Sequence, residues 1–259
     1  MALSKKYKGI VISVRKTGEQ SKSLDLLTEE VGLVHCVARN ASKSKRRFSG
    51  VLEPFTSATF QVKGSNKYRP TLETVDEVIS RFAISRSMSS FYLATYACQW
   101  IKIMAKDAES HSMWYKELAD FLDWMSEKDC SFITLFWFEL LLLHQGGVMP
   151  DLEVCPHCDC QLDGANVVVF DTCDGMFVHQ KHLKDEIGAM KRNPKARVVS
   201  MGDIKIMSRL LVSSQDECMQ IKLSAKQVDS IGFLLESLLK IHFGKIPSSR
   251  ESFVKFMEI

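Results

Sequence analysis

Alternating apolar and polar positions dominate the first 80 residues, and this pattern predicts β-strands. Residues 7–14, 33–38 and 56–63 are rich in β-branched or aromatic side chains. Glycines and prolines separate these runs, as is usual at turns and strand ends. Five short strands within about 75 residues suit a small closed barrel better than a sandwich.

From about residue 84 the apolar pattern takes the period of amphipathic helices, first over 93–104 and then over 114–125. The most apolar stretch, 132–143, contains Glu139 and falls short of the about 20 residues that a bilayer span needs, so it predicts a buried core helix. A non-helical insert is expected at about 146–193, with two more helices after it, the last over about 228–242. The fold class is therefore α+β: a barrel over 1–80, then a helical domain over 81–259 that carries the insert.

Composition and charge narrow the classes of function. The chain is 46% hydrophobic and 25% charged, with 13 Gly and 6 Pro, which excludes a collagen-like, disordered or low-complexity protein. The net charge of +3 is uneven: residues 1–80 hold 14 Lys and Arg against 8 Asp and Glu, and the rest holds 20 against 23. We therefore expect a polyanionic partner to bind the N-terminal part.

The N-terminal residues predict a location. Residues 1–8 lack the run of about 7–15 apolar residues that a secretory signal needs. We expect a cytoplasmic protein that does not contact a membrane and whose eight cysteines stay reduced.

The sharpest chemical motif lies in the insert. Cys155 and Cys158 form a C-x2-C pair, and this spacing lets two thiolates bind one tetrahedral metal ion. An H-x2-H pair, His179 and His182, follows roughly 20 residues later. Together the four residues predict a closed metal site with a structural role.

Two features of the insert bear on that site. Strand-like residues 167–170 and the turn at Asp174 and Gly175 resemble the hairpin of a zinc ribbon. Three spare ligands leave the assignment open: His157, Cys160 and Cys173. The alternative is a site without metal, in which the histidines lie on the surface and the thiols are buried and free.

A basic segment lies between two of the predicted strands. Residues 39–47 carry five cations and no large apolar side chain. A run of this kind is either a solvated loop or, beside a barrel, a segment that follows a phosphate backbone. The candidate DNA-binding residues are these five cations and two weaker candidates near the start of the chain: Arg39, Lys43, Lys45, Arg46, Arg47, Lys8 and Arg15.

Catalytic motifs are absent from the sequence, which contains no G-x-S-x-G, H-E-x-x-H, G-x-G-x-x-G or P-loop pattern. We therefore expect no enzymatic activity. The competing hypothesis is a hydrolase or nuclease with a catalytic metal at the Cys/His cluster, which needs an open coordination position and a carboxylate base. Asp159, Asp171, Asp174 and Asp185 lie near in sequence. Two ligand pairs, each with two residues between its ligands, favour a closed site instead.

Several segments together resemble the RecO recombination-mediator family of bacterial DNA repair. In chain order they are residues 9–12 (GIVI), 18–19 (GE), 27–33 (LTEEVGL), 38–46 (ARNASKSKR), 52–55 (LEPF), Leu142, Leu143, Gly147, Pro150 and Leu152 leading into Cys155 and Cys158, 242–244 (HFG) and 248–250 (SSR). No single segment is specific, but their ordered set is, and it covers nearly the whole chain.

The resemblance implies an N-terminal OB-fold, a helical C-terminal domain and a zinc-ribbon-like insert. It also implies a non-enzymatic role: binding single- and double-stranded DNA, annealing complementary strands and helping RecA load onto strands coated by single-stranded-DNA-binding protein (SSB). The implied partners are RecR, the acidic C-terminal tail of SSB and, functionally, RecF and RecA. The implied location is the bacterial nucleoid within the cytoplasm.

The chain departs from the family pattern in the insert. The second C-x2-C of the family is His179-x2-His182 here, and its Gly-Gly is Asp174-Gly175. Three outcomes follow: zinc bound by two cysteines and two histidines, zinc that recruits Cys173, or no zinc. An OB-fold and zinc-ribbon protein that binds RNA is the alternative function.

Overall fold

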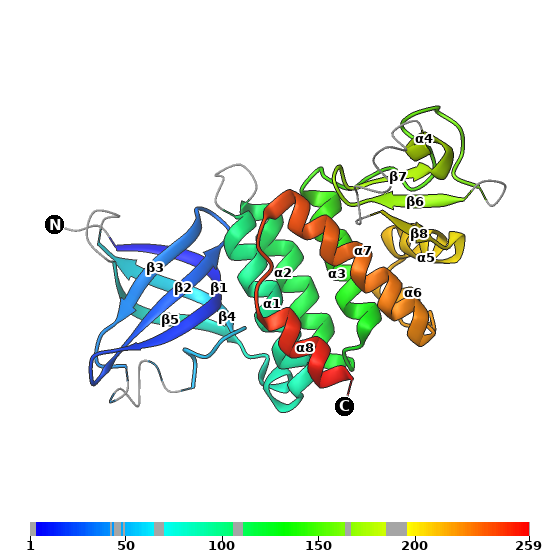
Figure 1. Ribbon diagram of the computed structural model, residues 1–259. Helices are drawn as coiled ribbons and strands as arrows, with labels where there is room; N and C mark the ends of the chain where they lie inside the picture. Colours follow the sequence, from blue (N-terminus) through cyan, green and yellow to red (C-terminus); the bar gives the residue numbers. More distant parts are fainter. Residues whose placement is uncertain are drawn as a thin grey trace. The chain divides into compact units, whose positions relative to one another are not determined.

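The structure is a computed structural model that describes residues 4–41, 43, 48, 50–64, 70–105, 111–163, 167–184 and 196–258 (Figure 1). Its contacts group into two compact units. The first comprises Met1–Cys130 and Pro247–Ile259, and the second comprises Ser131–Ile246. Each unit is described by itself below.

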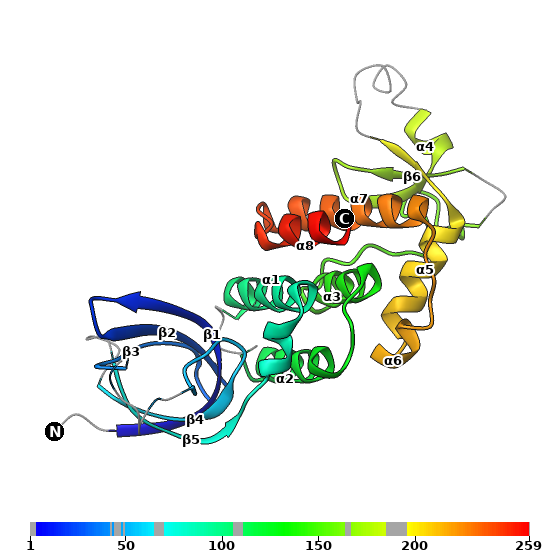
Figure 2. The same cartoon turned by 90° about the horizontal axis from the view of Figure 1, so that it is seen from below.

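The first unit begins with five strands in a closed barrel. The strands are β1 (Ser4–Thr17), β2 (Ser21–Thr28), β3 (Gly32–Ala38), β4 (Ser57–Lys63) and β5 (Thr71–Ile79). They pair in the order β1-β2-β3-β5-β4, and β1 also pairs with β4, which closes the ring seen in Figure 2. All pairings are antiparallel except that of β3 with β5. The barrel predicted from the alternating pattern is thus present.

The barrel interior is filled by the apolar side chains of alternate strand positions. Leu24, Leu26, Phe60 and Leu72 are each at most 1% exposed. Gly9 lies where β1 passes over this core: a Cβ there would come within 3.2 Å of the Phe60 ring and of a backbone oxygen of β2. Glycine therefore allows β1 to pair with both of its neighbours.

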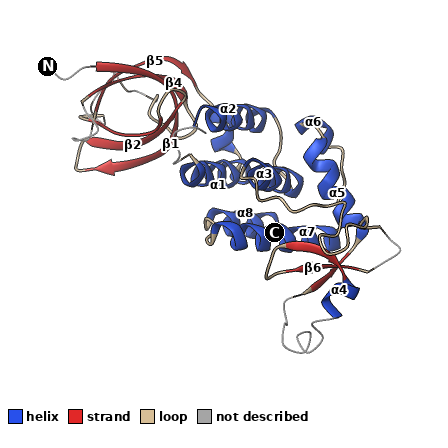
Figure 3. Ribbon diagram, turned by 90° about the horizontal axis from the view of Figure 1, so that it is seen from above, coloured by secondary structure: helices blue, strands red, loops and turns tan. Residues whose placement is uncertain are grey.

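Three α-helices and a short 3-10 helix complete the first unit: η1 (Phe82–Arg86), α1 (Met88–Met104), α2 (His111–Glu127) and α8 (Ser249–Met257). The apolar stripes predicted over 93–104 and 114–125 are buried faces of α1 and α2. Helix α8 lies beside α1 (Figure 3), where Ser249 donates a hydrogen bond of 2.7 Å to Gln99. The two rings of Tyr92 and Phe256 also meet there, with centroids 6.2 Å apart.

A buried arginine joins the barrel to the helices of the first unit. The guanidinium of Arg81 donates to the backbone oxygen of Phe55 at 2.8 Å, to Ser57 Oγ at 2.7 Å and to Asp123 Oδ1 of α2 at 2.7 Å. This explains why the compact unit extends beyond residue 80, although the strands end at Ile79. The predicted second domain, 81–259, is accordingly shared between the two units.

The second unit combines helices with a small sheet. It contains α3 (Phe132–Gln145), β6 (Val168–Asp171), β7 (Met176–His179), α4 (Gln180–Lys184), β8 (Arg197–Val199), α5 (Met201–Val212), α6 (Gln215–Cys218) and α7 (Ala225–Phe243). Helix α3 is the predicted core helix, and it packs against α5 and α7. No helix among the described residues is long and apolar enough to cross a membrane.

The chain from the insert onward differs from the sequence prediction in three respects. The insert at about 146–193 was expected to be non-helical, but it contains the five-residue helix α4. Two helices were expected after the insert, whereas the structure has α5, the four-residue α6, α7 and α8. Strand β8 also pairs with β6 and makes the hairpin a three-stranded sheet in the order β7-β6-β8. A three-residue strand and a four-residue helix are too short to show a period in the sequence.

The hairpin of β6 and β7 lies against α7 through Gly175. Its φ of +69° belongs to the left-handed region, and a Cβ there would lie 3.3 Å from Leu238 and 3.4 Å from His242. We expect Gly175→Ala to cost about 2 kcal/mol in the free energy of unfolding, part from the backbone and part from the contact. Urea denaturation measures the loss.

Gly147→Ala is the matched control for this substitution. Gly147 has a nearly equal φ of +66°, but nothing lies within 4 Å of the added Cβ. The difference between the two variants therefore isolates the contact with α7. Equal losses of stability would contradict a tight fit between the hairpin and this helix.

Candidate nucleic-acid interface and metal centre

The second unit brings four metal-binding side chains together. One ligand atom from each of Cys155, Cys158, His179 and His182 lies within 4.8 Å of every other. Cys155 and His179 are buried, and Cys158 and His182 are half-buried. These are the four residues that the two sequence motifs predict, and the group could hold a metal ion.

The first ligand pair lies in a tight turn. The amide of Asp159 donates to the carbonyl of Cys155 at 2.9 Å, and the amide of Cys155 donates to the carbonyl of Cys160 at 2.9 Å. Asp159 has a φ of 52°, a conformation that aspartate tolerates better than most residues. The turn directs the thiols of Cys155 and Cys158 to the same side.

The second ligand pair spans a strand end and a helix. His179 is the last residue of β7, where it pairs with Val168 of β6, and His182 lies three residues later in α4. The chain changes from strand to helix between these two residues, and this change leaves both imidazoles close to the two cysteines.

One ligand-to-ligand distance matches that expected around a tetrahedral zinc ion. Zinc–sulfur bonds of about 2.3 Å and zinc–nitrogen bonds of about 2.0 Å place sulfur and nitrogen ligands about 3.5 Å apart. The Sγ of Cys158 and the Nδ1 of His179 are 3.5 Å apart. The spare cysteines, Cys160 and Cys173, are exposed and lie outside this group, as does the exposed His157.

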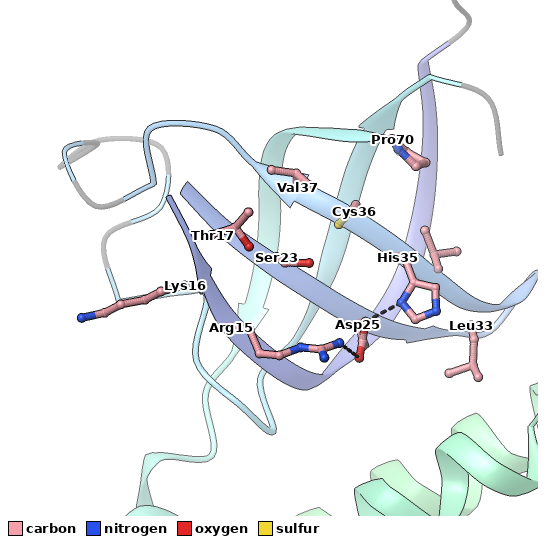
Figure 4. A pocket seen from close by; sticks show the side chains of 11 residues that line it. Arg15, Lys16, Thr17, Ser23, Asp25, Leu33, His35, Cys36, Val37 and Pro70 are labelled. Atoms are coloured by element: carbon pink, nitrogen blue, oxygen red, sulfur yellow. Dashed lines mark hydrogen bonds and ion pairs between the residues drawn. The ribbon is translucent and has the colours of Figure 1, made fainter. Parts of the chain in front are cut away.

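In the first unit, a hollow of about 770 Å³ opens on one face of the barrel (Figure 4). Residues 15–17 of β1, 23 and 25 of β2, 33–37 of β3 and residue 70 line it. Arg15 contributes a cation to the wall of the hollow, and the hydroxyl groups of Thr17 and Ser23 add hydrogen-bonding groups, whereas the side chain of the neighbouring Lys16 points away from Arg15 (Figure 4).

A buried carboxylate lies at the centre of this wall. Asp25 is 2% exposed and accepts hydrogen bonds from His35 of β3, from Lys102 of α1 and, at 3.2 Å, from Arg15 of β1. Burial by itself raises the pKa of Asp25, but the hydrogen bonds and charges of Lys102 and His35 outweigh it, so the pKa lies below its usual value. Asp25 is therefore an anion near neutral pH that binds cationic side chains from three elements.

The barrel register shows where the basic segment starts. Lys16 of β1 is opposite Lys22 of β2, and Lys22 is opposite Ala38 of β3. Arg39, the first cation of the segment, directly follows Ala38, so it begins at the same end of the barrel as Lys16. Arg39 and Lys43 are exposed there.

Three of the predicted DNA-binding residues, Lys45, Arg46 and Arg47, lie outside the described residues. Arg15 lines the hollow, whereas Lys8 is exposed seven residues earlier on β1, about 23 Å away along an extended strand. The structure thus places Arg15 near the start of the basic segment and Lys8 away from it.

Comparison with known proteins covers both units. Residues 1–80 match the family model described as Recombination protein O N terminal, and residues 86–251 match the one described as Recombination protein O C terminal. The chain belongs to the RecO family. The resemblance in the sequence is thereby confirmed.

Individual RecO proteins show the same relationship. A DNA repair protein RecO of Anaeromyxobacter sp. (strain K) is 32% identical over 171 residues, which cover 66% of this chain and 67% of that protein. The DNA repair protein RecO of Alkaliphilus metalliredigens (strain QYMF) is 22% identical over 244 residues, covering 93% and 94%. The similarity therefore extends over nearly the full length of a RecO protein.

Sequence reasoning missed two residues of the barrel hollow in this RecO-family chain. Asp25 and His35 were not candidates, since neither belongs to a basic run or a ligand motif. One signal was available for Asp25: it interrupts the buried apolar run of Leu24, Leu26 and Leu27. A charged side chain in such a run requires a partner.

Proposed function

We propose that this RecO-family protein binds single- and double-stranded DNA in DNA repair and homologous recombination. The observation that carries the proposal is the match of both RecO family models, in chain order, to a chain whose barrel has a cationic face. The names of the relatives, DNA repair protein RecO, support the biological role.

The barrel is the proposed DNA-binding domain, and we assign it to the OB-fold. A closed five-stranded barrel in which β1 pairs with both β2 and β4 supports this assignment. OB-folds bind oligonucleotides across their second and third strands, and the hollow with Arg15 and His35 lies on these strands and the adjoining end of β1. The basic segment at the same end would extend the cationic track.

The proposed mechanism is neutralisation of phosphates. Phosphate contacts carry affinity without reading the sequence of bases, so the protein would hold any strand. When cations from residues 39–47 and Arg15 screen two strands at once, their mutual repulsion falls and complementary bases can pair. Annealing of complementary strands is the expected activity, and help in loading RecA onto SSB-coated strands would follow from it.

Zinc is the proposed structural cofactor. The ion would be held by Cys155, Cys158, His179 and His182. It would cross-link the turn that carries the two cysteines to the hairpin of β6 and β7 in a zinc-ribbon-like insert. With four protein ligands the ion has no open position for substrate. This supports a role without catalysis.

Cys36, which is among the described residues that line the hollow, is unsuited to nucleophilic chemistry. Burial, and secondarily the charge of Asp25, raise the pKa of the Cys36 thiol to about 12. A thiol in this state is protonated near neutral pH and does not act as a nucleophile. We accordingly propose that the protein is a non-enzymatic mediator.

The proposed protein partners are those of the RecO family: RecR, the acidic C-terminal tail of SSB and, functionally, RecF and RecA. Annealing of two complementary strands precoated with SSB, with and without this protein, tests the proposal. We expect acceleration that declines with added salt and with removal of the SSB tail. No acceleration by folded protein would overturn it, and preference for structured RNA would favour the RNA-binding alternative.

Replacement of the five cations Arg39, Lys43, Lys45, Arg46 and Arg47 by alanine tests the proposed DNA contact. If each meets one phosphate of a single strand, the slope of log K against log salt becomes shallower by about 3.5, and affinity falls at least tenfold at moderate salt. Fluorescence anisotropy with a labelled thymidine 30-mer measures both.

A charge-matched control removes five exposed cations of the second unit: Lys205, Arg209, Lys222, Lys226 and Lys245. This variant has the same net charge as the first but keeps the barrel intact. We expect its salt slope to stay close to that of the wild type. Equal effects of the two variants would contradict a specific role of the basic segment.

A further inference from the structure

We propose that Arg15 and His35, held in place by the buried carboxylate of Asp25, form a phosphate subsite in the barrel hollow. The inference rests on the proposed DNA-binding function and deepens it, because it names the phosphodiester group as the ligand of the hollow and Asp25 as its positioning residue.

Side-chain exposure distinguishes the positioning residue, Asp25, from the two residues that would bind the phosphate, Arg15 and His35. Asp25 is 2% exposed, whereas the side chains of Arg15 and His35 are 65% and 60% exposed. Figure 4 shows both bonds converging on the carboxylate from opposite sides. Asp25 is too deeply buried to bind a ligand itself, while Arg15 and His35 face solvent.

Arg15 keeps most of its hydrogen-bonding capacity in this arrangement. A guanidinium has five N–H donors in a planar fork, and the bond to Asp25 engages one of its nitrogen atoms, at 3.2 Å. The remaining donors suit two oxygens of one phosphate. A flexible side chain that is already oriented loses less conformational entropy when the anion binds.

The charges of the cluster favour an anion in spite of the carboxylate. Arg15 and Lys102 offset Asp25 with one positive charge to spare. Lys102 reaches Asp25 from α1 and is outside the residues that line the hollow. Lys102 therefore offsets part of the negative charge of Asp25, so Asp25 neutralises less of the positive charge of Arg15.

Asp25 has a second conceivable role, as an internal anion that competes with phosphate for Arg15. The two roles make opposite predictions in a double-mutant cycle. If Asp25 positions Arg15, then Arg15 contributes less once Asp25 is replaced. If Asp25 competes, Arg15 contributes more. Asp25→Asn adds one positive charge to the protein. Both proteins compared in the D25N background, one without and one with R15A, carry this extra charge, so it cancels when the effect of R15A is calculated.

The experiment measures the affinity of a labelled thymidine 30-mer for the wild type, R15A, D25N and the double variant at one salt concentration. We expect R15A to weaken binding about fivefold to tenfold in the wild-type background and less than about twofold in the D25N background. Lys16→Ala is the matched control, since Lys16 is the next cation along β1 and is not among the described partners of Asp25. Its effect should be the same in both backgrounds.

An equal or larger effect of R15A in the D25N background would overturn the inference and leave the proposed function intact. If D25N does not fold, the cycle of R15A with H35A replaces it. Two donors to one phosphate are expected to be coupled, and additive effects would overturn the subsite.

If the wild type binds no DNA, the proposed function fails, and tripolyphosphate becomes the probe. A rise in Tm with tripolyphosphate that R15A abolishes would still support the subsite, whereas no rise in the wild type would overturn it.

Discussion

Cys155→Ser is expected to reduce bound zinc from one ion per chain to nearly none and to unfold the insert. Cys155 is fully buried, and its thiolate would supply one of four bonds to the ion. Structural zinc contributes about 10–16 kcal/mol of apparent binding free energy in small domains, and this energy is also folding energy. The few buried apolar side chains among the described residues of the insert cannot replace it: Leu152, Leu162, Val168, Val169, Phe170, Phe177 and Val178.

Metal analysis of protein purified without chelator measures the first effect, and proteolysis of the insert measures the second. Cys160→Ser is the control, because Cys160 is exposed and lies outside the ligand group. It should retain zinc and resist proteolysis like the wild type. A zinc-free wild type with a folded insert would contradict the proposed site.

Arg81→Ala is expected to lower the free energy of unfolding of the first unit by about 1–3 kcal/mol, since Asp123 is exposed and the main loss is the buried hydrogen bond to the Phe55 carbonyl. Its side chain is 3% exposed and satisfies the Phe55 carbonyl, Ser57 and Asp123. Phe55 is a buried aromatic residue with a φ of 71°, and such backbone conformations cost about 1–3 kcal/mol unless neighbouring groups hold them. The substitution removes that support and leaves a buried carbonyl without its donor.

Urea denaturation followed by far-UV circular dichroism measures this loss. Arg86→Ala is the control: Arg86 is exposed, and its guanidinium lies 5.3 Å from the centroid of the Phe82 ring. An exposed cation–π contact contributes about 0.5–1 kcal/mol, so the control should lose no more than that. A similar loss in both variants would show that Arg81 does not act as a link between barrel and helices.

Much of the fold could be predicted because its patterns are local. The strands predicted over 7–14 and 33–38 lie within β1 and β3, and the one over 56–63 begins one residue before β4. The apolar run 132–143 lies within α3. Each strand or helix of this length repeats its burial pattern several times, so the period is visible in the sequence. The short β8 and α6 repeat no pattern, and α8 was missed although it is nine residues long.

The candidate site divides in the same way. The two ligand pairs, C-x2-C and H-x2-H, were visible because each is a short motif with its own local geometry. By contrast, Asp25 meets His35 ten residues away and Lys102 on α1, 77 residues away. No spacing rule links residues so far apart, because the closing of the barrel and the docking of α1 bring them together.

Local sequence was thus enough to establish strands, helices, the uneven charge and the two halves of a metal site, since all of these depend on side chains a few positions apart. Three results required the tertiary fold: the convergence of the four ligands, the cationic hollow around Asp25 and the inclusion of α8 in the first unit. They depend on contacts between distant segments, and such contacts form only when the burial of apolar surface brings those segments together.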